Sequence, residues 1–439
     1  MNTYYSKDIM ITDNLGYNQM IDLLKEQEDY CLYENNGDIS IGIGNHIDIK
    51  VSSTTIEMTL DGNSKQFNAT DLCNDLEKVL RNIELEGWRL YGISNFALAR
   101  FTYGLPIGNE YDELMHLFIP SKEYRISDNK ITLRALHEKD IEVMEEQLKQ
   151  SIDCNSSTEI KFLNPDKVTN YDEDYYKKIV DEGVAEIRED KYQKIILSRK
   201  VPIESRLNMS QTYIKGRSVN TPARSYICRI GDLEVVGFSP ETVAEVDADR
   251  TVYTFPLAGT RALTKSDDIN KKLRAELVND TKEIAEHAIS VKLADEELQQ
   301  ICEEKSVVVT EFMSVMERGT VQHLGSRLRG KLKDELTPWH ALCKLFPAVT
   351  ASGIPKREAI EAIGRIEKEV RDLYSGSVLI YDYDGMLDAA LVLRTIFQTA
   401  NETWTRVGAG IVNMSNSERE FIETQEKVSS IAKTLVIEE

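Results

Sequence analysis

Cysteine is sparse in this sequence, and its spacing excludes two common roles. The 439 residues include 6 cysteines, which are Cys31, Cys73, Cys154, Cys228, Cys302 and Cys343. None lies in a C-x-x-C pair or in a short cluster with histidine, so neither a zinc site nor a disulfide framework is indicated. We therefore expect all of them to be reduced thiols in the core.

Long apolar runs and clusters of basic residues are also missing. No stretch approaches the roughly 18 apolar residues of a membrane span. The start, MNTYYSKDIMITDN, lacks the basic and apolar regions of a secretory signal. Lysine and arginine number 53 against 74 acidic residues, which gives a formal net charge of −21 without any Lys/Arg-rich run. These absences disfavour nucleic acid and membranes as partners and predict a cytoplasmic protein.

The first 170 residues are predicted to be rich in strands. Turn signals at Asn36-Gly37 and Asp61-Gly62 separate alternating segments such as ISIGIGNHIDIKV and TIEMTL, as expected for β-hairpins. One helix is expected within TDLCNDLEKVLRNI, where an apolar stripe is formed by Leu72, Leu76, Val79 and Leu80. A polar, aperiodic stretch at 151–167 predicts a connection to the second half.

From residue 171 onward, helices and hairpins are mixed. YYKKIVDEGVAEIRED has apolar residues at helical spacing, and hairpins are expected around Gly231-Asp232 and Asp384-Gly385. No repeat, low-complexity tract or linker rich in Pro, Gly and Ser divides the chain. Because direct hairpins build antiparallel sheets, we predict an α+β fold with large antiparallel sheets and helices packed outside them.

The stretch KIILSRK begins a strongly apolar predicted strand with a lysine. Alternation along a strand sends Lys194, Ile196 and Ser198 to one face. A buried ammonium is costly, so either Lys194 reaches water from the strand end or it lies in a polar cavity where a desolvated amine does chemistry. From this window alone we favour the first interpretation, because lysine is seldom buried.

Two predicted helices carry pairs of carboxylates. In DTKEIAEHAISVKLADEEL, Glu283 and Glu286 are three residues apart and share one face. In SEREFIETQEKVSSI, Glu420 and Glu423 have the same spacing. Together they would offer an oxygen-rich site for Mg²⁺. Taken singly, each helix is more typical of a solvated surface, with Glu423 and Lys427 as an ordinary i,i+4 pair.

Glycines and an arginine indicate an anion site near the second helix. Gly408 and Gly410 in RVGAGIV stand between a predicted strand and that helix, where backbone N–H groups would approach an anionic oxygen. A tight strand exit explains them at least as well. Arg394 closes ALVLR and Tyr374 precedes the matching strand, so both are expected near one sheet end. Arginine binds carboxylates through a bidentate fork, although a strand-end arginine that reaches solvent is equally consistent.

Three further segments contain reactive or small residues. Glu241 ends GFSPE and would act as an acid if burial raised its pKa towards neutral, whereas a glutamate at a helix start is the alternative. FPLAGTR, from Phe255 to Arg261, ends a predicted hairpin with small residues. His323 in VQHLGS is more typical of a satisfied core histidine than of a catalyst.

In this order, these segments resemble the chorismate-utilising enzymes, which are isochorismate and salicylate synthases and the synthase subunits that make anthranilate and aminodeoxychorismate. The resemblance covers at least residues 175–435, through KIILSR, GFSPE, PLAGTR, KEIAEH, VQHLGS, FPAVTASGIPK, LYSG, LVLR, GAGI and EREFIETQEK. The N-terminal part, including RLYGISNFALAR, is most similar to siderophore-type salicylate synthases, which lack a glutaminase domain.

The resemblance implies a single chorismate-binding domain over 1–439, with two stacked antiparallel sheets and outer helices. Residues 1–170 would form its strand-rich part and 171–439 its catalytic part, so 151–167 would be a crossover. It also implies a metal site, in which Glu286 and Glu423 would hold Mg²⁺ with Glu283 and Glu420 in its water shell. That ion would bind the ring carboxylate of chorismate.

The remaining pocket residues follow from the same resemblance. Arg394 and Tyr374 would hold the carboxylate of the enolpyruvyl group. The backbone of Gly408 and Gly410 would assist them, together with Lys427. The pocket would further be lined by Gly259, Thr260, His323, Thr350 and Leu393.

By resemblance, Lys194 would be the general base that activates water for attack at ring C2, and Glu241 the general acid that protonates the departing C4 hydroxyl. Family members that add ammonia lack a lysine base at this position, so Lys194 favours water as the nucleophile. Ala258 agrees, because aminodeoxychorismate synthases tend to carry a lysine there. Water addition gives isochorismate, and a salicylate synthase then eliminates pyruvate in the same site, a pericyclic step that needs a suitable bound conformer.

The similarity over the full chain favours a salicylate synthase for siderophore biosynthesis, with isochorismate synthase as the alternative. A non-catalytic binder of chorismate-like acids is the third hypothesis, disfavoured because the base, acid and metal positions are all filled. We expect no glutaminase subunit, and we expect the chain to be a monomer or a loose homodimer. Phe255 stands where relatives carry a polar residue, which affects the expected contacts at the pocket rim.

Overall fold

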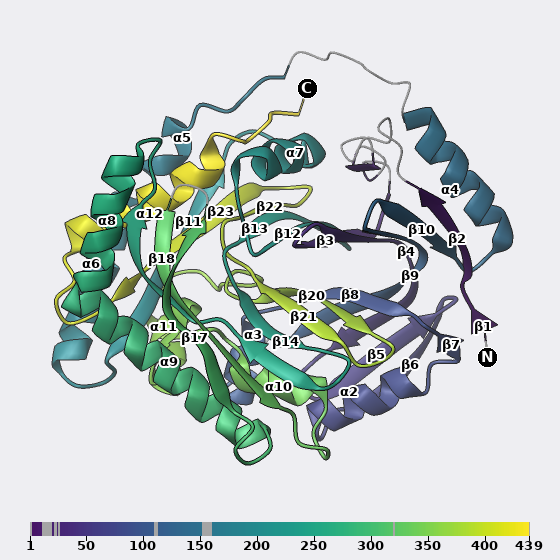
Figure 1. Cartoon of the computed structure of the whole chain (residues 1–439), viewed down its shortest axis with the longest axis horizontal. Helices are drawn as coiled ribbons and strands as arrows, with labels where there is room; N and C mark the ends of the chain where they lie inside the picture. Colours follow the sequence, from purple (N-terminus) through teal and green to yellow (C-terminus); the bar gives the residue numbers. More distant parts are fainter. Residues whose placement is uncertain are drawn as a thin grey trace.

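Two long strands, β4 (Asp38–Val51) and β9 (Met115–Ser127), join the two layers of the fold. The computed structural model describes residues 2–10, 20–21, 24, 27–108, 113–151, 160–318 and 321–438. β4 and β9 pair with each other, with a register shift between Asn45 and Ile47. On one side of this shift they continue into the first sheet, and on the other side β9 continues into the second (Figure 1).

The first sheet combines strands from both halves of the sequence. In spatial order it contains β2 (Tyr5–Met10), β10 (Lys130–Ala135), β9, β4, β3 (Tyr30–Asn35), β12 (Arg224–Ile230), β13 (Leu233–Ser239), β22 (Thr395–Gln398), β23 (Thr403–Ile411), β11 (Lys194–Ile203) and β19 (Gly353–Ile354). The hairpins predicted at Asn36-Gly37 and Gly231-Asp232 are confirmed, and positive φ values at these turns explain their residues.

The second sheet carries the remaining long strands. From β9 it runs through β8 (Arg89–Ser94), β20 (Ser377–Asp382), β21 (Leu387–Leu391), β14 (Thr242–Val246), β15 (Thr251–Thr254), β18 (Val321–Lys331) and β17 (Val308–Arg318). Beside β15, β16 (Leu257–Ala262) also pairs with β18. β5 (Thr55–Leu60) and β6 (Asn63–Asn68) extend from β4, and β1 (Asn2–Thr3) pairs with β7 (Leu85–Glu86). The hairpins predicted at Asp61-Gly62 and Asp384-Gly385 are confirmed.

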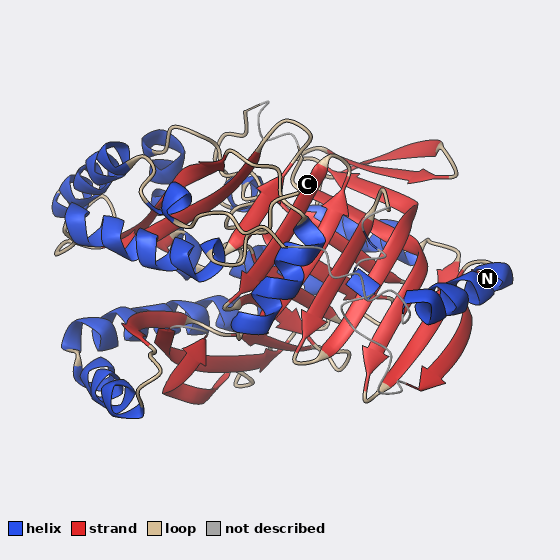
Figure 2. Ribbon diagram, turned by 90° about the horizontal axis from the view of Figure 1, so that it is seen from above, coloured by secondary structure: helices blue, strands red, loops and turns tan. Residues whose placement is uncertain are grey.

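Helices cover the outside of these layers (Figure 2). They are α2 (Leu72–Arg81), α3 (Ala97–Thr102), α4 (Glu138–Ser151), α5 (Asp166–Thr169), α6 (Glu173–Arg188), α7 (Met209–Val219), α8 (Asp267–Asn279), α9 (Thr281–Ile301), α10 (Pro338–Leu345), α11 (Lys356–Ile366) and α12 (Ser417–Ala432), with a 3₁₀ turn at Val349–Ala351. The helices predicted from apolar periodicity, α2 and α6, are confirmed. So is the α+β class, with stacked antiparallel sheets and outer helices in a single domain.

The predicted connection at 151–167 is only partly visible. α4 ends at Ser151 and α5 begins at Asp166, while 152–159 lie outside the described residues. Among the residues described, no helix is long and apolar enough to cross a membrane.

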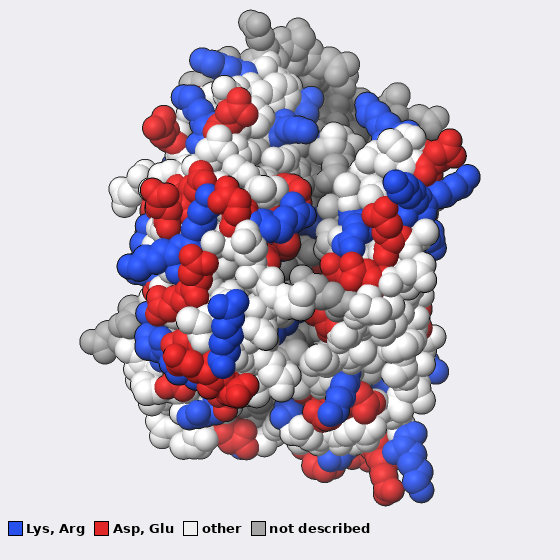
Figure 3. All heavy atoms as spheres, turned by 90° about the vertical axis from the view of Figure 1, so that its left-hand side faces the viewer, with Lys and Arg blue, Asp and Glu red and all other residues white. Residues whose placement is uncertain are grey.

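Charges of both signs are mixed on the face that carries α6, α8 and α9. Figure 3 shows acidic and basic side chains interspersed there, on both sides of a furrow. Pairs such as Lys177 with Glu173 on α6 (2.5 Å) and Lys292 with Glu296 on α9 (3.6 Å) contribute to this pattern. The net charge of −21 therefore does not form a patch of one sign on this face.

Two cysteines differ from the expectation of isolated thiols. Cys31 on β3 and Cys228 on β12 are register partners with Cα atoms 4.0 Å apart, and they form a disulfide. The expectation was wrong for this pair because 197 residues separate the two cysteines and only the β3–β12 ladder brings them together. Cys73, Cys302 and Cys343 are free, and Cys154 lies outside the described residues.

Candidate active site

Lys194 is buried at the start of β11, where its amine contacts a carboxylate. The residue is 5% exposed, and Nζ donates a hydrogen bond of 2.6 Å to Oε1 of Glu286 on α9. A Cβ atom at Gly410 on the neighbouring β23 would lie 3.3 Å from Cε of Lys194, so glycine leaves room for this pair. The interpretation that Lys194 reaches water is therefore wrong, and the amine lies in a polar part of the interior.

Glu241 is also buried, in the short connection between β13 and β14. It is 4% exposed, and the Thr350 hydroxyl donates a hydrogen bond to its Oε1. Burial raises the pKa of Glu241 to about 7, against the opposing effect of this hydrogen bond. Nearby positive charges also act to lower the pKa, and they belong to Lys194, Arg394 and Lys427. The helix-start alternative is wrong because a strand follows, and a carboxyl group with this pKa is able to donate a proton near neutrality.

On α9, Glu283 and Glu286 both pair with cations from the sheets. Glu286 contacts Lys194, and Oε1 of Glu283 lies 3.1 Å from Nη1 of Arg261 on β16. Gly259 has a φ of 75°, and a Cβ atom there would lie 3.0 Å from Oε2 of Glu283. The two carboxylates therefore face the sheets and are not simply part of a solvated helix surface.

On α12, Lys427 connects the helix to β23. Its Nζ lies 2.9 Å from Oε1 of Glu423 and donates a hydrogen bond of 2.9 Å to the carbonyl oxygen of Gly408. Glu420 on the same helix is 5% exposed. The Glu423–Lys427 pair is therefore half-buried and bonded to β23. It differs in this from the ordinary surface pair that the sequence suggested.

The four carboxylates match Mg²⁺ in chemistry, because this hard cation prefers oxygen ligands. Over the described ranges, however, no three or more His, Cys, Asp or Glu side chains are arranged to hold a metal ion. The ammonium groups of Lys194 and Lys427 lie beside Glu286 and Glu423 instead. The four glutamates thus offer the kind of ligand that Mg²⁺ prefers, while Glu286 and Glu423 are paired with lysines in this structure.

Gly408 and Gly410 lie inside β23, and not between a strand and a helix as expected. They pair with Ser198 and Ile196 of β11. A Cβ atom at Gly408 would collide with the carbonyl oxygen of Leu197, so the close approach of the two strands requires glycine. The expectation of free N–H groups at a helix start was therefore wrong, because α12 begins later along the chain.

Tyr374 and Arg394 lie beyond the same end of the β20–β21 ladder, as predicted, because pairing ends at Ser377 and Leu391. Tyr374 is 3% exposed, and burial raises its pKa. Arg394 has a φ of 51° in the connection between β21 and β22. β21 thus ends at Leu391, and Arg394 lies in the turn that follows it instead of closing the strand as expected.

The other predicted pocket residues occupy three places. Thr260 and His323 are register partners on β16 and β18, with Oγ1 and Nδ1 3.0 Å apart, and the Gly259 carbonyl oxygen lies 3.3 Å from the same nitrogen. Thr350 contacts Glu241 from the 3₁₀ turn. Leu393 packs against the hydrophobic core.

A hollow adjoins Glu241 on the side of α9. Thr350 and Phe255 are among the residues that line it. The guanidinium of Arg327 lies 4.6 Å from the centre of the Phe255 ring. Phe255 thus lies beside the hollow that adjoins Glu241.

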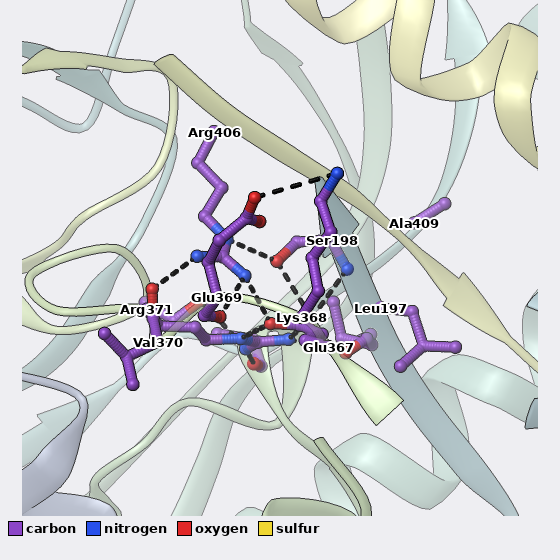
Figure 4. Close-up of polar contacts among 12 residues, drawn as sticks. Leu197, Ser198, Glu367, Lys368, Glu369, Val370, Arg371, Arg406 and Ala409 are labelled. Atoms are coloured by element: carbon purple, nitrogen blue, oxygen red, sulfur yellow. Dashed lines mark hydrogen bonds and ion pairs between the residues drawn. The ribbon is translucent and has the colours of Figure 1, made fainter. Parts of the chain in front are cut away.

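A buried ion cluster beside β11 was not found from the sequence. Glu367 contacts both Arg371 and Arg406 at 2.6 Å, and it also accepts hydrogen bonds from Ser198 (Figure 4). Glu367 and Arg371 have the i,i+4 spacing of a surface pair, which gives no sign of burial. The partner from β23 is remote in sequence, so only the fold brings the cluster together.

Comparison with known proteins shows which family the chain resembles over most of its length. The family model described as chorismate binding enzyme matches residues 28–433. A salicylate synthase from Mycolicibacterium paratuberculosis is 37% identical over 415 residues, which cover 93% of this chain and 90% of the relative. An anthranilate synthase component 1 from Methanothermobacter thermautotrophicus is 29% identical over 392 residues, 88% of this chain and 83% of the relative.

Solved structures have the same fold. Anthranilate synthase component I from Streptococcus pneumoniae superposes with a TM-score of 0.74 at 24% identity, covering 97% of this chain and 99% of the other. The menaquinone-specific isochorismate synthase from Escherichia coli has a TM-score of 0.74 at 19% identity, with coverages of 98% and 94%. At these identities the superpositions support the fold alone.

Proposed function

This chain belongs to the chorismate-binding enzyme family, and we propose that it is a salicylate synthase, which converts chorismate to isochorismate and then to salicylate and pyruvate. The salicylate synthase relative, similar over nearly its whole length, supports this specific activity. The observation that carries its first reaction is the presence of both a buried amine, Lys194, and a buried carboxyl group with a pKa of about 7, Glu241.

In the first reaction, the Lys194 amine accepts a proton from water while the oxygen of that water bonds to ring C2. The ring double bonds shift, the C4–O bond breaks, and Glu241 donates a proton so that the hydroxyl leaves as water. The amine must be neutral to accept the proton, so Lys194 has to leave its ion pair with Glu286 for this step. A proton then returns from the amine to the carboxylate through solvent.

The second reaction needs orientation more than acid or base groups. The enolpyruvyl ether bond breaks as the C2 hydrogen moves to the methylene carbon, which releases pyruvate and leaves the aromatic ring. Arg394, Tyr374 and Lys427 would hold the enolpyruvyl carboxylate in the required conformer, with the Gly408 and Gly410 backbone beside it. The positive charges of Arg394 and Lys427 near Glu241 support their placement at one anion site.

Glu286 and Glu423 would hold Mg²⁺, with Glu283 and Glu420 in its water shell. When bound, the ion would neutralise the ring carboxylate of chorismate and so favour attack on the ring. The carboxylate oxygens of the four residues support this assignment, and the lysines now beside two of them would give way.

Isochorismate synthase, which stops after the first reaction, is the second candidate, because no single residue reports the lyase step. Anthranilate synthases are also among the relatives. The buried Lys194 supports water over ammonia as the nucleophile, because it supplies a base that ammonia does not need. We propose that no glutaminase subunit is required and that the product enters siderophore biosynthesis in the cytoplasm.

The test is to incubate the purified chain with chorismate and Mg²⁺ in the absence of ammonium salts. Salicylate is followed by its fluorescence, and all products are separated by chromatography. We expect salicylate and pyruvate in equal amounts, and loss of both after addition of EDTA. Isochorismate without pyruvate would support the second candidate, anthranilate on addition of ammonium would support amination, and unchanged chorismate would contradict catalysis.

A further inference from the structure

The carboxylate of Glu367 accepts hydrogen bonds from the strand that carries Lys194. Its side chain is 1% exposed. Arg371 donates to both of its oxygens, over 2.6 and 2.9 Å, and Arg406 donates to Oε2 over 2.6 Å. The backbone N and Oγ of Ser198 donate to Oε1 over 2.7 and 2.9 Å. Burial alone would raise the pKa of Glu367, but the two arginines outweigh it and the pKa is lowered, so the carboxylate is charged.

We name Glu367, Arg371 and Arg406 the Glu367 triad (Figure 4). Arg371 extends it to two segments of the site. It donates over 2.7 Å to the carbonyl oxygen of Ile196, two residues after Lys194, and over 2.7 Å to that of Ala351, which follows Thr350. The guanidinium therefore connects the strand of the proposed base to the turn that contacts the proposed acid.

Both arginines of the triad also border Tyr374. The guanidinium carbons of Arg371 and Arg406 lie 5.7 and 5.8 Å from the centre of its ring. Arg406 donates from Nε to Oγ of Ser198 over 2.8 Å, which attaches β23 to β11. The triad thus contacts the strand of the proposed base, the turn that contacts the proposed acid, and the residue proposed to hold the substrate carboxylate.

We infer that the Glu367 triad is a positioning device, which fixes the Lys194 strand, the Thr350 turn and the Tyr374 ring relative to one another in the reacting geometry. This inference rests on the proposed function. We assign the triad no step of the chemistry. It acts through the backbone of Ile196 and Ala351 and through the ring of Tyr374. Catalysis is sensitive to such placement, since a displacement of about 1 Å lowers rates by about 10²-fold.

A structural role alone predicts something different. A buried ion pair contributes little net stability compared with apolar residues of the same volume, although breaking one is costly. The chain offers a matched comparison in Glu123 on β9, whose side chain is 1% exposed and which pairs with Arg125 (3.0 Å) and Arg134. Its strand carries none of the proposed site residues. If burial of a charge cluster were all that mattered, both glutamates would respond alike to substitution.

The experiment compares Glu367→Gln with Glu123→Gln on the folded full-length chain, measuring kcat, KM and the thermal midpoint. We expect Glu367→Gln to lower kcat by roughly 10- to 100-fold while KM changes less than about threefold. Glu123→Gln should keep kcat within about twofold, whatever its effect on the midpoint. Equal losses of kcat in both variants, or a Glu367→Gln variant with normal kcat, would overturn the inference.

Arg371→Lys provides a second variant if Glu367→Gln does not fold. A lysine keeps the charge beside Glu367 but not the fork that reaches Ile196 and Ala351, so kcat should again fall more than KM rises.

A wild-type chain that leaves chorismate unchanged would refute the proposed function and not the positioning. The positioning is then decided by amide hydrogen exchange of 194–198 and 350–351, which should quicken in folded Glu367→Gln or Arg371→Lys; unchanged exchange would overturn it.

Discussion

Nζ of Lys194 and Oε1 of Glu286 lie 2.6 Å apart, so the first residue of β11 is joined to the N-terminal part of α9. The amine of Lys194, the proposed base, and a metal ion would therefore compete for the carboxylate of Glu286. Any cation that binds Glu286 approaches the oxygen that the lysine now contacts. The order in which metal, substrate and water reach the site thus bears on whether the amine is free to accept a proton.

Replacing Lys194 by alanine removes the only atom of this residue that is able to accept a proton from water. We expect Lys194→Ala to lower the turnover of chorismate by about 10²- to 10⁴-fold, the usual contribution of a general base. Chorismate affinity should change less than about tenfold, since other residues are proposed to hold both carboxylates. Product formation and calorimetric binding measure the two effects separately.

Lys200→Ala is the matched control for this variant. Lys200 lies on the same strand and pairs with Glu402 at 2.7 Å, with its side chain 26% exposed. It should retain turnover within about twofold, because an exposed pair of this kind contributes little. Normal turnover in Lys194→Ala would remove the base assignment.

Glu241 should make the stability of the protein depend on pH. Its pKa is about 7 in the folded state against an ordinary value of 4.5. Between these values the folded state binds more protons than the unfolded state, so the contribution of Glu241 to stability is complete below about pH 4.5 and is lost as pH rises through about 7. The full loss is on the order of 3 kcal/mol.

Glu241→Gln removes this titration while keeping the size of the side chain. We would measure the free energy of unfolding in urea at about pH 5 and at about pH 8.5. The decrease between these pH values should be smaller for the variant than for the wild type, by about 3 kcal/mol. The same variant should be inactive, because glutamine has no proton to donate. Parallel changes in the two proteins would show that Glu241 is not the buried group that titrates.

Much of the fold is predictable from the sequence because it is built of local hairpins. Asn36-Gly37 and Asp384-Gly385 are turn signals between alternating segments, so they identify antiparallel strands without knowledge of distant contacts. Likewise, the apolar stripe of α2 marks a helix. What these signals do not reveal is which hairpins lie side by side, so the pairing of Cys31 with Cys228 was missed.

The site was predicted more by its ordered motifs than by any single residue. Lys194 on its own looks like a strand-end lysine, and its burial depends on Glu286, which is 92 positions away. Gly408 was expected between a strand and a helix, with a strand exit as the alternative, yet it lies within β23 and permits two strands to approach closely. Glu367 looks like half of a surface pair until Arg406 joins it from β23.

Glu423→Gln should weaken the response of the enzyme to Mg²⁺. Replacing a carboxylate by an amide removes a negative charge and a hard anionic donor, so the Mg²⁺ concentration for half-maximal activity should rise by about tenfold or more. Glu426→Gln on the same helix is the control, because Glu426 pairs with Arg419 at 3.2 Å and both side chains are exposed. Equal metal titrations of the two variants, each started from EDTA-treated protein, would remove Glu423 from the ligands.

Thr350→Val tests the hydrogen bond that stabilises the charged form of Glu241. The Thr350 hydroxyl donates to Oε1 of this carboxylate and lowers its pKa, against the larger effect of burial. A proposed acid works only while protonated, so kcat/KM of the wild type should fall as pH rises through about 7. In Thr350→Val this fall should move to higher pH by roughly one unit, the equivalent of a hydrogen bond to a charged group. Thr350→Ser keeps the hydroxyl and should keep the wild-type profile, whereas a profile unmoved in the valine variant would separate Thr350 from the acid.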